Sequence, residues 1–109
     1  MEHIKDPGDC RDIEEIRQEI DKIDKQIIEL FSARHEFVKE IVAYKNDENG
    51  VIARERQDFV LNERAKLAQK MGLNPEVFKK IFTILIEDNI SKELELLKQK
   101  LHKQNIKIE

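Results

Sequence analysis

Residues 13–44, IEEIRQEIDKIDKQIIELFSARHEFVKEIVAY, decide the fold, because their large apolar side chains recur every three or four positions. This apolar stripe consists of Ile13, Ile16, Ile20, Ile23, Ile27, Leu30, Phe37, Ile41 and Tyr44. Such spacing is typical of a long amphipathic α-helix that packs against other helices. We expect the helix to begin after Asp9 or Asp12 and to end near Tyr44 or Lys45. Its length of roughly 50 Å exceeds what a small single-chain domain needs.

The rest of the chain predicts two more helices and no strand. After a polar loop at 46–50, a helix over 53–71 is expected to end at Gly72 and to bury Phe59, Val60, Leu67 and Ala68. A third helix should begin at Asn74-Pro75-Glu76 and carry apolar residues as far as Leu97, and the pattern leaves its end in the polar tail open. Three glycines, two prolines and a charged fraction of 39% agree with an all-α protein. We therefore expect one helical domain over 1–109, with its core at about 10–97 and a polar tail at 98–109.

Composition also restricts the function. A net charge of −3 offers no basic surface for nucleic acid, and no apolar run is long enough to span a membrane. Cys10 is the single cysteine, so neither an internal disulfide nor a cysteine metal cluster is expected. The N-terminal residues lack the apolar segment of a secretion signal, so we expect a cytoplasmic protein.

Polar residues occupy positions on the inward stripes of all three predicted helices: Arg17, Arg34, Lys45, Arg54, Glu55, Asn89 and Glu93. A charge directed toward a core is costly unless it meets an opposite charge there. The excess is cationic, and guanidinium groups bind carboxylates well. These residues therefore indicate a site for a small dianion that carries two carboxylates.

Spacing along the first helix indicates a shared site. Arg34 and Lys45 are about 16 Å apart on one face, close enough for long side chains to converge. Arg17 lies about 25 Å from Arg34, too far to join them within one straight helix. Arg17 can contribute only if a second copy of the helix runs antiparallel to the first, which predicts a homodimer with two composite sites.

Ordinary structural roles remain open for each residue taken singly. Arg34 is also explained as a salt-bridged interface residue, and Lys45 as a cation favoured at a helix C-terminus. Arg17 could pair with nearby aspartates, and Asn89 could fix the register of a helix pair. Seven such residues on three helices nevertheless favour a site over independent structural roles.

The sequence resembles the all-helical (AroQ-type) chorismate mutases and the related isochorismate-pyruvate lyases. The resemblance is carried by IRQEIDKID at 16–24, by Arg34 and Lys45, by Arg54-Glu55-Arg56, and by the segment 82–93. It implies an intertwined antiparallel homodimer of three-helix chains, an isomerase activity in aromatic amino acid biosynthesis, and no metal or organic cofactor.

The resemblance also implies a role for each site residue. Arg17 of one subunit and Arg34 of the other would each hold a substrate carboxylate, and Lys45 and Glu93 would face the ether oxygen. Glu55 would bind the ring hydroxyl, while Arg54 and Asn89 would support the ring carboxylate. These assignments make Arg17, Arg34, Lys45 and Glu93 the expected catalytic residues.

Four features bear on the choice between the mutase and the lyase, and together they separate the two only weakly. Val51 stands where some mutases have an acid, and the short loop before Arg54 and the pair Asp9-Cys10 resemble the lyase. Arg54 itself is typical of the mutases, whereas the lyase has proline there. We therefore expect a chorismate mutase, with the lyase as the alternative. A helical dimerisation module without catalytic activity is the third interpretation.

Overall fold

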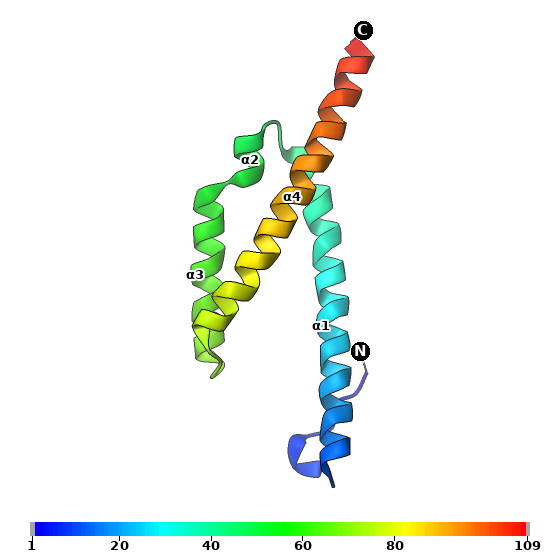
Figure 1. Ribbon diagram of the computed structural model, residues 1–109, viewed down its shortest axis with the longest axis vertical. Helices are drawn as coiled ribbons and strands as arrows, with labels where there is room; N and C mark the ends of the chain where they lie inside the picture. The colour runs from blue at the N-terminus through cyan, green and yellow to red at the C-terminus, as the bar shows by residue number, and fades with distance from the viewer. Residues whose placement is uncertain (1, 109) are drawn as a thin grey trace. The chain divides into compact units, whose positions relative to one another are not determined.

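A computed structural model describes residues 2–108, with side chains through Gln104, and every regular element among them is a helix (Figure 1). The all-α prediction is therefore confirmed. The chain divides into two compact units, Met1–Phe37 and Val38–Glu109, which are described separately. Within residues 2–108, no helix is both long and apolar enough to cross a membrane.

The first unit consists of a short 3-10 helix η1 (Pro7–Asp9) and most of helix α1 (Ile13–Ile41). Asp12 is the residue that begins α1, because its Oδ1 accepts a hydrogen bond from the Glu15 amide at 2.8 Å. This bond satisfies one of the backbone donors that a helix N-terminus leaves unpaired. Of the two expected caps, Asp12 is therefore the one that acts.

Asp12→Ala is expected to lower the free energy of unfolding by about 1 kcal/mol, the usual cost of losing an N-cap side chain. Asp9→Ala is the matched control, because Asp9 belongs to η1 and lies before the start of α1. Denaturant unfolding of both variants measures the difference. Equal loss in the two variants would contradict the assignment of Asp12 as the cap.

The residues before α1 fold back beside it (Figure 1). The Gln26 side-chain amide donates to the Glu2 carbonyl at 2.8 Å, and Lys5 lies 3.8 Å from the Glu15 carboxylate. The pKa of Glu15 is lowered, first because the Arg11 amide donates to its carboxylate and then because the Arg11 guanidinium does so. A lowered pKa in the folded state means that this stabilisation is present at neutral pH and is lost as the pH falls through that pKa.

The apolar stripe of 13–44 is helical as predicted, but it is not buried. All nine members are exposed, from 41% for Ile23 to 79% for Tyr44. Among the described residues of Met1–Phe37, the one buried residue is the carboxylate-bearing Glu19, so this unit has no hydrophobic core of its own. An apolar helix face of this length needs another surface to pack against.

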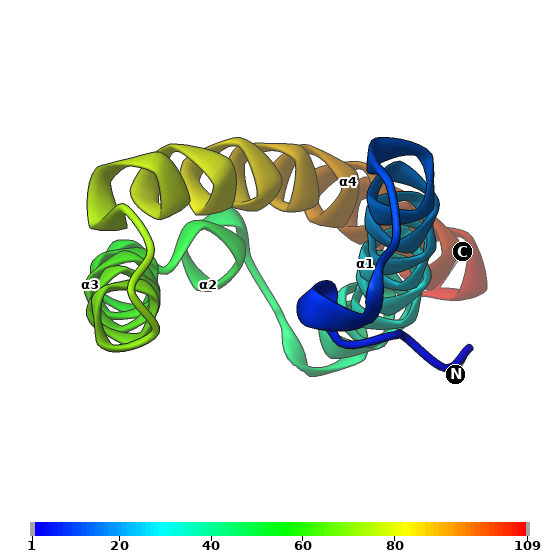
Figure 2. The same ribbon diagram turned by 90° about the horizontal axis from the view of Figure 1, so that it is seen from below.

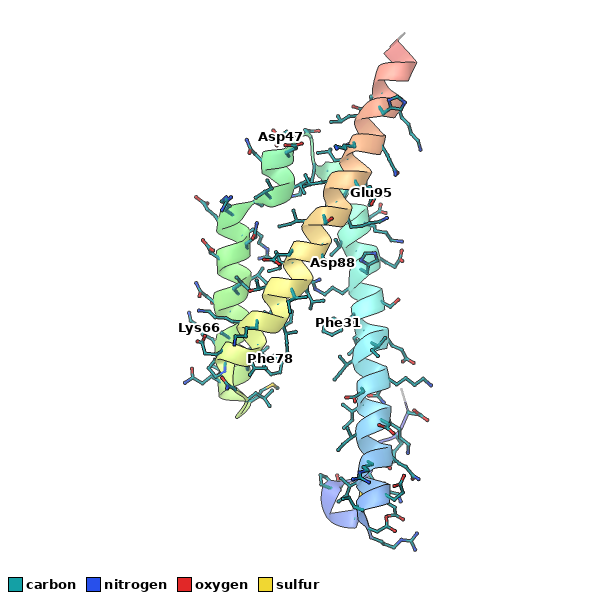
Figure 3. The ribbon with its side chains drawn as sticks, in the orientation of Figure 1. Phe31, Asp47, Lys66, Phe78, Asp88 and Glu95 are labelled. Atoms are coloured by element: carbon teal, nitrogen blue, oxygen red, sulfur yellow. The ribbon has the colours of Figure 1, made fainter. Side chains whose placement is uncertain are left out.

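The second unit begins with the end of α1 and continues through a 3-10 turn η2 (Val42–Tyr44) into helix α2 (Glu48–Ile52). The prediction of a loop at 46–50 was wrong for residues 48–50. Asp47 caps α2 by accepting from the Gly50 amide at 2.7 Å, and Figure 3 shows Asp47 where α2 begins. The polar residues read as a loop are thus a capped single-turn helix.

Two longer helices, α3 (Arg54–Lys70) and α4 (Pro75–Ile108), pack side by side near the turn that joins them (Figure 2). The predicted end at Gly72 is confirmed, since Gly72 has a φ of 76°. Asn74 caps α4 by accepting from the Glu76 amide at 3.0 Å. Val60 and Ala68 of α3 are buried as predicted, but Phe59 and Leu67 are each 53% exposed, so those two predictions were wrong for the single chain.

The core of this unit is a cluster of Val42, Val51 and Leu97, with Ile90, Leu94 and Leu96 packed around it. It joins η2, α2 and α4. Helix α4, whose end the sequence left open, continues to Ile108 through the polar tail. The description of 1–109 as a single domain stays a prediction.

Candidate active site

The core cluster fixes the position of Lys45, which follows η2 directly. The Lys45 amide donates to the Val42 carbonyl at 3.0 Å, which closes the 3-10 turn, and its backbone is extended with φ −103° and ψ 141°. Val42 is 5% exposed and packs against Val51 and Leu97. Lys45 itself is half-buried. A partly exposed cation thus directly follows a turn whose first residue, Val42, is anchored in the core cluster.

Asn89 and Glu93 lie on the buried face of α4. They are 7% and 8% exposed, and residues 89, 93 and 97 follow one another at intervals of four along the helix. Side chains spaced in this way lie on one face, which here is the face that Leu97 turns toward Val42 and Val51. The prediction that Asn89 and Glu93 point inward is confirmed. Their role in binding a ligand stays a prediction.

Arg54 and Glu55 occupy the first turn of α3 and are exposed in the single chain. They follow Ala53, which has the left-handed conformation φ 42°, ψ 61° and separates α2 from α3. Val51, two residues earlier, is 4% exposed and belongs to the hydrophobic cluster. The inward orientation expected for Arg54 and Glu55 is not found in the isolated subunit, and their binding roles stay predictions.

Arg17 and Arg34 both lie on α1, in the first unit. Arg17 is exposed and Arg34 is half-buried. Because α1 is one continuous helix, their separation of seventeen positions corresponds to about 26 Å along its axis. The separation predicted from the sequence therefore applies to the folded chain.

The sequence did not predict a role for Lys100 of α4. This residue belongs to the polar tail, and its ammonium donates to the backbone carbonyls of Val42, Ala43 and Lys45. It continues the series 89, 93, 97 at helical spacing, three residues after Leu97. That spacing was the available signal, and the polar composition of 98–109 obscured it.

Comparison with known proteins identifies the family to which this all-helical chain belongs. Residues 16–94 match the family model described as chorismate mutase type II. The matched segment includes Arg17, Arg34, Lys45 and Glu93. The chain belongs to the chorismate mutase type II family.

The names of individual relatives include both the lyase and the mutase activity. Isochorismate pyruvate lyase of Pseudomonas aeruginosa is 31% identical over 88% of this chain and 95% of its own length. Chorismate mutase of Methanocaldococcus jannaschii is 31% identical over 82% of this chain and 91% of its own length. A bifunctional chorismate mutase/prephenate dehydratase of Buchnera aphidicola is 32% identical over 76% of this chain but only 22% of its own length.

Proposed function

We propose that the protein is a chorismate mutase that converts chorismate to prephenate. The observation that carries the proposal is the arrangement around the core cluster. Lys45 comes directly after η2, whose first residue is Val42, and Glu93 and Asn89 are buried on the α4 face whose Leu97 packs against Val42. A cation and two polar side chains thus flank one apolar wall, as a compact dicarboxylate with an apolar ring requires.

The reaction needs no nucleophile, because it is an intramolecular rearrangement in which a C–O bond breaks while a C–C bond forms. The catalyst has to hold the flexible dianion in a compact conformation and to stabilise the negative charge that grows on the ether oxygen. Arg17 and Arg34 would hold the two carboxylates. Lys45 and a donor at position 93 would meet the ether oxygen, while Glu55, Arg54 and Asn89 would bind the ring substituents.

The active unit in this proposal is a homodimer. Arg17 is about 26 Å from Arg34 along α1, so one chain cannot place both on a small ligand. The exposed apolar stripe of α1 offers a surface on which a second α1 would pack. A two-fold arrangement of antiparallel helices would bury both stripes and bring each Arg17 to the partner's Arg34.

Two assays run side by side test the proposal. Prephenate formation from chorismate and pyruvate release from isochorismate are measured on the same preparation of the wild-type protein. Faster turnover of chorismate supports the mutase. Faster pyruvate release would favour the lyase, which the relative in Pseudomonas aeruginosa makes the second candidate. Absence of both activities would favour a helical dimerisation module without catalytic activity. A cytoplasmic location stays a separate prediction that these assays do not test.

Glu93→Gln is expected to preserve or raise mutase activity near pH 7 and to flatten its pH dependence. An ionised carboxylate facing the ether oxygen would repel the developing negative charge, whereas a protonated carboxyl or a neutral amide donates a hydrogen bond to it. The wild-type rate should therefore increase as the pH falls and the Glu93 carboxylate takes up a proton, until the protein unfolds.

Glu95→Gln is the matched control for that experiment. Glu95 lies on the same helix (Figure 3), but its side chain is 60% exposed and 3.8 Å from Lys92. Its removal should leave the pH profile of turnover unchanged. If Glu93→Gln and the wild type gave parallel profiles from pH 5 to 8, Glu93 would not face the reacting atoms.

A further inference from the structure

The ammonium group of Lys100 caps the turn that carries Lys45. Its Nζ donates to the carbonyl oxygens of Val42 at 3.4 Å, Ala43 at 3.2 Å and Lys45 at 2.8 Å. These carbonyls lie at the C-terminal end of a helical segment, where backbone acceptors have no partner within the helix and the dipole is negative. A lysine cation is well suited to that position.

These contacts fix the backbone of Lys45 on both sides. Its amide is held by the Val42 carbonyl at 3.0 Å, and its own carbonyl is held by Lys100 at 2.8 Å. The aliphatic stem of Lys45 lies beside Gly50 of α2. A Cβ atom added to Gly50 would be in van der Waals contact with Lys45 Cδ, at 3.7 Å. The backbone of Lys45 is therefore held by η2 and α4, and its aliphatic stem lies beside α2.

We propose that Lys100 is a positioning residue for Lys45. Lys100 would hold the Lys45 carbonyl so that the Lys45 ammonium points at the ether oxygen of the substrate. The inference rests on the proposed function of Lys45 and extends the machinery to a residue six positions beyond the segment that matches the family model. It also gives the polar tail after Leu97 a role in the site.

Lys100→Met removes the ammonium group but keeps most of the stem. We expect kcat for chorismate to fall by about 10- to 100-fold, the range for a small displacement of a catalytic group, while KM changes less than threefold. Lys100→Arg retains several donors for the same carbonyls and should keep kcat within threefold of the wild type. Lys103→Met, an exposed lysine one turn further along α4, is the matched control and should not change kcat.

A double-mutant cycle with Lys45→Met separates positioning from stability. If Lys100 acts through Lys45, Lys100→Met should lower kcat in the wild-type background and have no further effect on kcat when Lys45 is already methionine. A merely structural Lys100 would lower the unfolding temperature and leave kcat per folded molecule unchanged, which would overturn the inference. Equal losses in both backgrounds would also overturn it, since Lys100 would then act independently of Lys45.

The activity of the wild-type protein in the same assays shows whether a negative result contradicts the role of Lys100 or the proposed function itself. An active wild type with a fully active, folded Lys100→Met variant refutes positioning and leaves the mutase proposal intact. A wild type that turns over neither chorismate nor isochorismate refutes both. If Lys100→Met does not fold, the cycle is run with Lys100→Gln, which keeps an uncharged donor and should give a smaller decrease of kcat that again depends on Lys45.

Discussion

Arg34→Ala is expected to lower kcat/KM for chorismate by about 30- to 5,000-fold while the protein remains folded and dimeric. The truncation would leave one substrate carboxylate without its cationic partner in a partly desolvated site, a loss of about 2–5 kcal/mol. Arg34 is half-buried on α1, where a guanidinium can be both shielded from water and accessible to a ligand. The measurement is steady-state kinetics with thermal unfolding on the same preparation.

Arg64→Ala provides the matched control for Arg34. Arg64 is also half-buried, but its guanidinium lies 5.8 Å from the centre of the Phe82 ring, within the α3 and α4 pair. Its loss should cost about 0.5–1 kcal/mol of stability without a change in kcat/KM. If Arg34→Ala gave the same result as Arg64→Ala, with lower stability and normal turnover, Arg34 would be an interface residue and not a carboxylate ligand.

The sequence predicted the helices well because their signals are local. The three-and-four spacing of 13–44, the Asp12 cap and the Asn74-Pro75 start of α4 all depend on residues within a turn or two of each other. The burial of Asn89 and Glu93 followed from the same periodicity, because the apolar residues of α4 identify the inward face. Local signals of this kind are sufficient to place a residue on one face of a helix.

Very short elements and contacts between distant segments were missed. Residues 48–50 of helix α2 were read as part of a loop, because a five-residue helix gives no periodicity. Lys100 contacts carbonyls 55 to 58 positions earlier in the chain, so the helical spacing that places it near the face of Leu97 does not reveal those partners. Phe59 and Leu67 are exposed for a related reason, since the apolar pattern of α3 does not specify which surface covers each residue.

The exposed apolar stripe of α1 predicts that two inactive variants complement each other in a mixed dimer. Arg17→Ala and Lys45→Ala should each be nearly inactive alone, and mixing the two should restore activity. In a heterodimer, Lys45 of one chain and Arg17 of the other are both intact at one of the two composite sites. With random exchange, half of the dimers are mixed and half of their sites are complete, so the mixture should reach about one quarter of the wild-type activity.

The matched control is a mixture of Arg34→Ala with Lys45→Ala. In the proposed dimer both residues serve the same site from the same chain, so every site in that mixture lacks at least one of them and activity should stay near that of the single variants. Heterodimers are verified by co-purification of differently tagged subunits before each assay. Because α1 keeps Arg17 about 26 Å from Arg34, a site that uses both has to be shared. Verified heterodimers of Arg17→Ala and Lys45→Ala without activity would therefore refute the composite site, and recovery in the control mixture would refute the assignment of Arg34 and Lys45 to one chain.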